Sequence, residues 1–471
     1  MTVLYTERLK NYIIEVTTLN NVYKITAVIL AAGEGKRMYS KLPKVLHKIC
    51  GVTMVEHVIN CAKEIGCEEP VVVIGHGAEQ VRETIKDVKF VMQEPQLGTG
   101  HAVMQAGEYI GDNDILVLYG DTPLVSADKI SEMYQFHKAG NYGATVLTAD
   151  LENPSGYGRI IRNHIGLIES IVEDKDADQE VKKVKEINSG MYFFKGTELK
   201  EALKKLTNNN AQGEYYLTDA LQILKAEGHE IAAFKTNDPT EIMGVNNKLQ
   251  LSEAAKIMQS RILKSHMLSG VTIIDANNTY VDKTVKIARD VTIYPGCILE
   301  GSTMIDEDCI IGPNTTIINS ILNKNVTAKN SVILDNEIGE STTIGPFAYL
   351  RPGNVIGRNA KIGDFVEMKN SNFGDNSKAS HLAYIGDADV GDNVNLGCGV
   401  VFVNYDGKKK YKSIVEDDCF VGCNVNLVAP ITVKRGSYVA AGTTLTKDVP
   451  EDSLSIGRVR QENKEGWMKN K

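Results

Sequence analysis

The chain has 471 residues, of which 42% are hydrophobic and 24% charged, a composition typical of a globular protein of two or three domains. Its formal net charge of −8 argues against a nucleic-acid binder that works by general electrostatics, although local phosphate pockets remain compatible with it. The eight cysteines form no C-x-x-C pair, and no apolar run approaches about 18 residues, so we expect no zinc site, disulfide framework, signal peptide or membrane span, and a cytoplasmic protein.

Residues 25–246 alternate apolar strands with helical segments. Strands are expected at 25–30, 70–75 and 115–120, and helices at about 53–67 and 98–109. Short apolar runs separated by helices predict a mostly parallel sheet with both faces covered. We therefore expect an α/β fold, a doubly wound (Rossmann-like) domain whose ligands bind at the carboxyl ends of its strands. Residues 1–24 are an extension to which we assign no function.

A connecting helix is expected over residues 247–269. Its apolar residues Leu251, Ala255, Met258 and Ile262 are spaced by four, three and four positions, which places them on one helix face.

From residue 270 to about residue 455 the apolar period changes to six. This period is typical of a parallel β-helix, here expected to be left-handed, in which three hexapeptides close one coil. We expect its flat outer faces to pair in a homo-oligomer, most simply a homotrimer, and residues 456–471 to form a tail. The residues in phase are Val281, Ile287, Ile293, Leu299, Ile305, Ile311 and Ile317, then Ile338, Ile344, Leu350, Ile356, Ile362 and Met368, then Val390, Leu396 and Phe402, and finally Val415, Val421, Leu427, Val433, Val439 and Leu445.

Two segments of the first half carry candidate chemistry. The sequence LAAGEGKRM follows the first strand, where its glycines would let backbone N–H groups approach phosphate and Arg37 and Lys44 would add cationic donors. A plain strand-to-helix turn is the alternative. Asp121 follows another strand end, where it could hold Mg²⁺ or merely form a turn before Thr122.

The β-helix carries a second set of polar residues. Arg351 and Lys369 are followed by His381, Tyr384 and Asn395, within a segment that otherwise repeats apolar hexads. An imidazole that titrates near neutrality can take a proton from an attacking amine. A solvated surface histidine is the alternative for His381 alone, and its neighbours favour the catalytic role.

In chain order, L-A-A-G-x-G-x-R-M, L-P-K, QLGTGHA, YGD, GYGRI, INSGMY and GVNN resemble the sugar-1-phosphate nucleotidyltransferases. With the β-helix attached, about residues 25–467 resemble the bacterial bifunctional N-acetylglucosamine-1-phosphate uridylyltransferases and glucosamine-1-phosphate acetyltransferases. The resemblance implies UTP and acetyl-CoA as co-substrates, Mg²⁺ as cofactor, small-molecule sugar phosphates as substrates, and an acetyl-CoA site between subunits.

The resemblance also implies roles for individual residues. Nucleotide contacts fall on Leu30, Ala31, Ala32, Gly33 and Lys44, uracil-reading positions on Gln93, Gly98 and Thr99, sugar contacts on Gly158, Glu173 and Asn188, and Mg²⁺ ligands on Asp121 and Asn246, with Tyr119 and Gly120 preceding Asp121 in the same site; Arg37 and Lys44 would stabilise charge during catalysis. In the β-helix, His381 matches the general base, Arg351 and Lys369 the sugar-phosphate ligands, Tyr384 and Asn395 further substrate contacts, and Asn404, Tyr405, Ala441 and Arg458 the acetyl-CoA site, with Glu367 as a partner for this cluster.

Cys398 and Cys423 depart from the family pattern, in which we expect alanine and serine at these acetyl-CoA positions. We therefore predict that a thiol-alkylating reagent slows acetyl transfer more than uridylyl transfer. The alternative is that the two cysteines are inert core thiols. Two other functions are considered: a single-activity nucleotidyltransferase with a regulatory β-helix, and an assembly protein whose β-helix only oligomerises.

Overall fold

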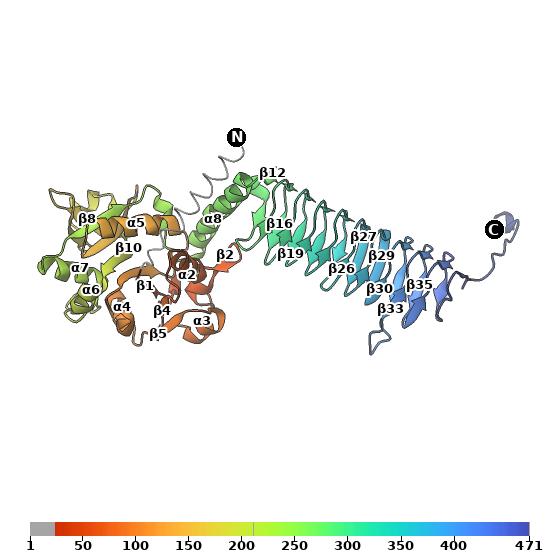
Figure 1. Ribbon diagram of the computed structural model, residues 1–471, viewed down its shortest axis with the longest axis horizontal. Coiled ribbons are helices and arrows are strands. Elements are labelled where there is room, and N and C mark those ends of the chain that lie inside the picture. The colour runs from red at the N-terminus through yellow and green to blue at the C-terminus, as the bar shows by residue number, and fades with distance from the viewer. Residues whose placement is uncertain (1–23, 211, 471) are drawn as a thin grey trace, which may run out of the picture. The chain divides into compact units, whose positions relative to one another are not determined.

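The computed structural model describes residues 24–210 and 212–470, and the chain divides into two compact units, Met1–Met258 and Gln259–Lys471. Residues 1–23 of the expected extension lie outside the described part of the chain. Figure 1 shows the two contrasting architectures, a helix-covered sheet and a run of short parallel strands. The expected fold class is confirmed in both.

The first unit is built on one sheet with the strand order β11-β7-β10-β6-β1-β4-β5. Strand β1 pairs in parallel with β4 and β6, as the buried apolar runs predicted, whereas β10 lies antiparallel between β6 and β7. A hairpin of β8 and β9 attaches to β10. The bounds are β1 (Ile25–Leu30), α2 (Met54–Glu64), β4 (Val71–Ile74), α3 (Ala78–Thr84), β5 (Lys89–Met92), α4 (Thr99–Gln105), β6 (Asp114–Tyr119), α5 (Ala127–Ala139), β7 (Ala144–Asp150), β8 (Arg159–Arg162), β9 (Ile168–Val172), β10 (Glu186–Lys195), α6 (Gly196–Leu203), α7 (Leu217–Ala226) and β11 (Ile231–Lys235).

Helices cover both faces of this sheet because successive strand side chains point to opposite faces. In β1, Ala27 and Ile29 join a core with residues of α2, α3 and α5, while Val28 joins a second core with residues of α4, α6 and α7. The sheet is therefore buried on both faces, and its strand ends are left to carry ligand groups.

Helix α8 (Lys248–Leu268) links the sequence of the two units. Its buried side chains are Ala254, Met258 and Leu263. Of the expected apolar face, Met258 is buried, and Leu251, Ala255 and Ile262 are half-buried.

The second unit is a left-handed β-helix of hexapeptide repeats. Val281 pairs with Leu299 and Leu299 pairs with Ile317, so a regular coil takes 18 residues, or three hexads. Every predicted in-phase residue is buried except Ile287, which is half-buried against the same core. The phase breaks are steps of five residues, such as Ile317 to Leu322, and one loop between Phe402 and Val415.

The strands of this unit are β12 (Thr272–Ile273), β13 (Tyr280–Val281), β14 (Lys286–Ile287), β15 (Thr292–Ile293), β16 (Ile298–Glu300), β17 (Met304–Ile305), β18 (Ile310–Gly312), β19 (Thr316–Ile318), β20 (Ile321–Leu322), β21 (Thr327–Lys329), β22 (Val332–Leu334), β23 (Glu337–Ile338), β24 (Thr343–Ile344), β25 (Tyr349–Leu350), β26 (Val355–Ile356), β27 (Lys361–Lys369), β28 (Asn372–Phe373), β29 (Lys378–Gly386), β30 (Ala388–Val390), β31 (Asn395–Leu396), β32 (Val401–Val403), β33 (Ser413–Val415), β34 (Phe420–Val421), β35 (Asn426–Val428), β36 (Ile431–Val433), β37 (Tyr438–Val439), β38 (Thr444–Leu445) and β39 (Leu454–Ser455).

The corners of the coils require left-handed backbone. Asn and Asp supply many of these residues, such as Asn325 and Asn359 with φ of 59° and 52°. Their short polar side chains tolerate this conformation better than most others do. Three bulky residues, Phe347, Phe365 and Leu382, also have positive φ, at 61°, 56° and 40°. Such backbone is strained for large side chains, and strain of this kind concentrates at functional sites.

Candidate functional sites

The first site forms where β1 and β6 end side by side. Leu30 pairs with Tyr119, and the Gly120 N–H donates to the Leu30 carbonyl at 2.9 Å. The Val245 N–H donates to the carbonyl of Asp121, also at 2.9 Å, which brings the segment before α8 to the same edge. Three sequence-distant segments therefore meet at the carboxyl ends of the strands.

Lys44 joins two of the predicted residues at this edge. Its Nζ forms an ion pair with Asp121 Oδ2 and lies 3.2 Å from Asn246 Oδ1. Both partners of the ion pair are largely buried, with side chains 13% and 17% exposed. The carboxylate oxygen of Asp121 and the amide oxygen of Asn246 thus converge on one cationic group. Oxygen atoms of these two kinds are ligands that Mg²⁺ prefers.

A Mg²⁺ at Asp121 and Asn246 would need further ligands to complete its shell. Within residues 24–210 and 212–470, no group of three or more His, Cys, Asp or Glu side chains could enclose a metal. Mg²⁺ typically uses only one or two carboxylates and completes its shell with phosphate and water. The pair Asp121 and Asn246 therefore fits a Mg²⁺ that is bound together with a phosphorylated substrate.

A pocket of about 340 Å³ collects the predicted nucleotide residues. Gln96, the first residue of the QLGTGHA motif, was not among the predicted site residues and fixes the loop by donating to the Ala32 carbonyl at 2.6 Å. The buried Gln93 amide donates to the Gly98 carbonyl at 2.9 Å. The residues that line this pocket include Leu30, Ala31, Ala32, Gly33, Lys44, Gln93, Gly98, Thr99, Tyr119 and Asp121.

Gly98 is required at its position. Its φ is +100°, and a Cβ there would lie 2.6 Å from the Tyr215 carbonyl oxygen. The glycine thus allows the chain to turn tightly into α4, which begins with Thr99.

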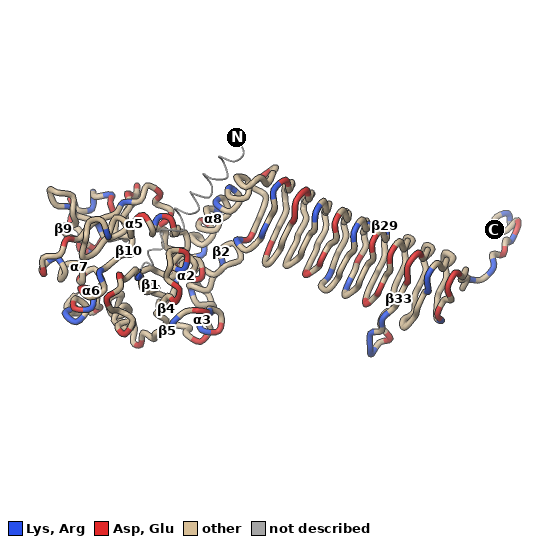
Figure 2. Tube along the Cα trace, in the orientation of Figure 1, with Lys and Arg blue, Asp and Glu red and all other residues tan. Residues whose placement is uncertain are grey.

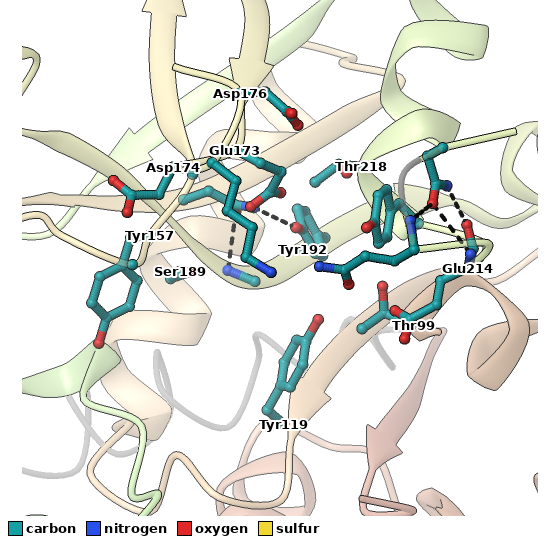
Figure 3. A pocket seen from close by; sticks show the side chains of 18 residues that line it. Thr99, Tyr119, Tyr157, Glu173, Asp174, Asp176, Ser189, Tyr192, Glu214 and Thr218 are labelled. Carbon is teal, nitrogen blue, oxygen red and sulfur yellow. Dashed lines mark hydrogen bonds between the residues drawn. The ribbon is translucent and has the colours of Figure 1, made fainter. Parts of the chain in front are cut away.

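A second, larger cavity of about 690 Å³ adjoins the first and shares Thr99, Tyr119 and Glu214 with it. It contains the predicted sugar residues Gly158, Glu173 and Asn188. In Figure 3 the ring of Tyr119 lies across this cavity from Glu173 and Asp176. The two pockets therefore border each other along these shared residues.

An irregularity of β10 positions Asn188 at this cavity. The pairing of β10 with β7 shifts register between Asn188 and Tyr192, and Gly190 has a φ of +82°. The Asn188 amide donates to the Tyr192 hydroxyl at 2.8 Å and accepts from the Gly190 N–H at 3.0 Å. Strand bulges re-aim side chains in this way next to ligand sites.

Burial changes the acidity of two groups in the larger cavity. Burial raises the pKa of Glu173, and the neighbouring carboxylates of Asp176, Asp219 and Asp174 raise it further. Burial, followed by the charge of Asp121, raises the pKa of Tyr119. Both groups therefore hold their protons more strongly than an ordinary glutamate or tyrosine does.

Arg37 stands apart from the predicted set. It lies in the short 3-10 helix η1 (Lys36–Met38), is exposed, and lines neither pocket. Glu214, by contrast, lines both pockets and was missed. It lies on an irregular segment before α7, where no periodic pattern marks it in the sequence.

The second site lies on one corner of the β-helix. Asp364 and His381 are paired across adjacent coils, and Nδ1 of His381 lies 2.6 Å from Asp364 Oδ1. Both side chains are open to solvent, 59% exposed for His381 and 38% for Asp364. The hydrogen bond with His381 is the main reason that the pKa of Asp364 is lowered. Asp364 was not predicted. Glu367, predicted as a partner for this cluster, pairs with its member Arg351 at 3.0 Å.

A group of cations lies on the same coils. Lys369 lies 4.0 Å from Asp387, and its pKa is lowered first by a hydrogen-bonding contact with Lys410, then by burial and by the positive charges of Lys410 and Arg351. Lys410 comes from the basic loop that interrupts the hexads before β33. Figure 2 shows blue segments on the loop next to β33. Crowded cations of this kind attract anions, of which a phosphate group is one.

Asn404 and Tyr384 adjoin this group of cations. The buried Asn404 amide donates to Asp387 Oδ2 at 2.6 Å and lies 3.5 Å from the Tyr384 hydroxyl. A cavity of about 260 Å³ opens beside them, lined by Asp387, Lys410 and other residues of these coils. Tyr405 follows Asn404 but is exposed, and its hydroxyl donates to the Gly407 carbonyl at 2.7 Å.

The remaining predicted residues lie on the next coils. Asn395 begins β31 and pairs with Phe420. Arg458 donates to the Ala441 carbonyl at 2.6 Å. Cys398 and Cys423 are exposed, so they are not core thiols.

None of the helices in the described part of the chain is long and apolar enough to cross a bilayer.

Fold and sites together define a two-domain transferase, a nucleotidyltransferase sheet joined to a hexapeptide-repeat β-helix. The family model "Nucleotidyl transferase" matches residues 26–240, and "Bacterial transferase hexapeptide (six repeats)" matches residues 284–319. The chain belongs to the family of bifunctional GlmU proteins.

Three relatives, each named bifunctional protein GlmU, show how completely the chain matches this family. The relative from Alkaliphilus oremlandii is 57% identical over 449 residues, covering 95% of this chain and 99% of its own. That from Alkaliphilus metalliredigens is 54% identical over 450 residues with the same coverage. That from Acetivibrio thermocellus is 55% identical over 447 residues, covering 94% of this chain and 97% of its own.

Proposed function

We propose that the chain makes UDP-N-acetylglucosamine by two reactions in separate domains. Residues 270–455 transfer the acetyl group of acetyl-CoA to the amine of glucosamine-1-phosphate. Residues 25–246 then transfer the uridylyl group of UTP to N-acetylglucosamine-1-phosphate and release pyrophosphate. The observation that carries this proposal is the presence, in one chain, of a carboxylate–amide–ammonium cluster at strand ends and a histidine–carboxylate pair beside crowded cations.

Uridylyl transfer requires positioning and neutralisation of charge more than a protein nucleophile. The sugar-phosphate oxygen attacks the α-phosphorus of UTP, and pyrophosphate leaves. Lys44 lines the first pocket and would stabilise the charge that develops on the phosphates. Asp121 and Asn246 would hold Mg²⁺, which neutralises phosphate charge when bound.

Acetyl transfer requires a base, because an ammonium group has no lone pair with which to attack a thioester. His381 would take the proton from the sugar amine through Nε2, since its Nδ1 is engaged by Asp364. Asp364 acts through His381 and is therefore a positioning residue. Arg351, Lys369 and Lys410 would bind the sugar phosphate, and coenzyme A leaves as the thiol.

The corner of the β-helix also supports assembly of the enzyme into a homotrimer. Phe347, Phe365 and Leu382 follow one another on adjacent coils and are 56%, 60% and 57% exposed. Exposed apolar side chains in a row are typical of surfaces that bind another chain. A second copy of the chain packed here would border His381 directly and complete an acetyl-CoA site between subunits. Both reactions use soluble metabolites, in keeping with a cytoplasmic enzyme.

Two single substitutions test the proposal. His381→Ala should reduce coenzyme A release with glucosamine-1-phosphate by at least about 100-fold, since a general base contributes roughly 10²–10⁴. Pyrophosphate release from UTP with N-acetylglucosamine-1-phosphate should be unchanged. Asp121→Ala should give the reverse pattern, so each activity is the control for the other. Loss of both activities in a folded variant, or of neither, would refute the assignment of residues to reactions.

A further inference from the structure

Cys398 and Cys423 occupy the same corner of two successive coils. Leu396 pairs with Val421, and each cysteine follows two residues later. The Asn424 N–H donates to the Cys398 carbonyl at 2.8 Å, and the Gly442 N–H donates to that of Cys423 at 2.8 Å. The two thiols are therefore stacked, and Ala441 occupies the next place on this corner.

This stack continues the line of the proposed acetyl-transfer site. Lys378 pairs with Asn395 and Ala379 with Leu396, so His381 occupies the corner one coil before Cys398. The order along the corner is Asp364, His381, Cys398, Cys423. Cys398 thus lies one coil from the imidazole that the proposed reaction uses, and Cys423 lies one coil beyond Cys398.

The geometry of adjacent coils suits a disulfide. Neighbouring strands in a sheet are about 4.8 Å apart, and disulfides join residues whose Cα atoms are about 4.4–6.8 Å apart. Both side chains point out of the coil into solvent, whereas the other six cysteines are buried or half-buried. The pair is therefore accessible to an oxidant without unfolding.

We propose that Cys398 and Cys423 form a reversible disulfide, made by a hydroperoxide, that turns off acetyl transfer and leaves uridylyl transfer intact. The Cys398 thiolate attacks one peroxide oxygen, the O–O bond breaks, and a sulfenic acid and an alcohol or water form. The Cys423 thiol then attacks the sulfenic sulfur, forming the S–S bond while water leaves. Two thiols and one hydroperoxide thus give one disulfide, one water and one alcohol (or a second water).

The effect on activity rests on the proposed function of His381. A bond between the two corners draws Cys398 toward Cys423 and ties together two positions assigned to acetyl-CoA. The thioester must approach His381 across this corner, so the linked form should lose acetyl transfer. Nothing in the linked corner belongs to the pockets of the first unit.

The test is to oxidise the full-length enzyme with hydrogen peroxide, block the remaining thiols with iodoacetamide, and map the peptides by mass spectrometry. A peptide pair joined through Cys398 and Cys423 is expected, with at least tenfold loss of acetyl transfer, recovery with dithiothreitol, and uridylyl transfer within twofold of its starting value. Cys398→Ala and Cys423→Ser are the matched variants, and each is compared with its own unoxidised sample. In both, the ratio of oxidised to unoxidised activity should stay near one.

Three results would overturn the proposal. The first is the absence of the linked peptide, and the second is a link that forms without loss of acetyl transfer. The third is a loss of acetyl transfer on oxidation that is as large in the two cysteine variants as in the wild type. An unoxidised enzyme without acetyl transfer would instead refute the proposed function. The peptide map would still decide whether the disulfide forms.

Discussion

The pairing of Asp364 with His381 has a consequence for the proposed acetyl transfer. The carboxylate accepts from one ring nitrogen and so fixes which nitrogen faces the substrate. Asp364→Asn keeps the size of the side chain but removes its charge. We expect kcat for acetyl transfer to fall by at least about tenfold, with little change in KM for acetyl-CoA, because a correctly oriented base acts mainly in the transition state.

Asp364→Glu supplies the matched control, since it retains the charge and should recover part of the lost kcat. Equal kcat for the wild type and Asp364→Asn would show that this hydrogen bond has no role in catalysis.

The contact between Lys369 and Lys410 predicts a pH dependence of substrate binding. The pKa of Lys369 is lowered, so it loses its proton at a lower pH than an ordinary lysine, and KM for glucosamine-1-phosphate should rise correspondingly early as the pH increases. Lys410→Ala removes the largest cause of that lowering. The rise in KM should then move to higher pH, although KM near neutrality should be severalfold greater because one cation is lost.

Lys408→Ala is the control for this measurement, because Lys408 lies on the same loop and does not line the adjoining cavity. A KM profile of Lys410→Ala that keeps the wild-type midpoint would contradict the proposed coupling.

The sequence pointed to most site residues but not to their partners. Lys44, Asp121 and Asn246 were assigned from motifs, yet only the folded chain shows one ammonium joining the other two. Asp364 lies one coil before His381, so the coil repeat held a signal for this pair that was not used. Lys410 could not be found in this way because its loop leaves the repeat.

The corners of the β-helix depend on residues that accept a left-handed backbone. Asn359 is exposed and has a φ of 52°, a conformation that asparagine and glycine accept more readily than alanine does. Asn359→Ala should lower the free energy of unfolding by about 1 kcal/mol, whereas Asn359→Gly should change it by only a few tenths. Urea unfolding followed by far-UV circular dichroism measures both, and equal midpoints for the two variants would contradict this account of the corner.

At the level of elements, the apolar period predicted the β-helix better than it predicted the sheet of the first unit. A six-residue repeat fixes which side chains enter the core, and the structure buries nearly all of them. In the sequence, the five-residue steps between buried residues were recognised only as breaks in the phase of the repeat. Such a step shortens one corner of a coil but leaves the next apolar residue inside the core. The antiparallel position of β10 was not foreseen, since buried strands of either direction have similar apolar runs.

At the scale of the whole molecule, the residues of each proposed reaction belong to one compact unit, so a change in assembly should affect one reaction only. Phe347 is exposed and its ring stacks on that of Phe365, with ring centroids 5.6 Å apart. Phe347→Lys would place a charge in the proposed subunit contact. We expect sedimentation at the rate of a single chain, at least about tenfold less acetyl transfer, and unchanged uridylyl transfer, since burying an unpaired charge is strongly unfavourable.

Phe347→Leu keeps an apolar side chain and should remain a trimer. A trimeric Phe347→Lys with full acetyl transfer would place the subunit contact elsewhere on the β-helix.

Gln259 closes the first coil of the solenoid. Its amide nitrogen lies 3.2 Å from the Val281 carbonyl oxygen, and its amide oxygen accepts from the Val281 N–H at 3.3 Å. One side-chain amide thus takes the place of the peptide group that a preceding coil would supply. An open edge of parallel strands is a template on which another chain can add. The glutamine therefore occupies these two backbone groups at the edge of the first coil, and another chain could not pair with them there.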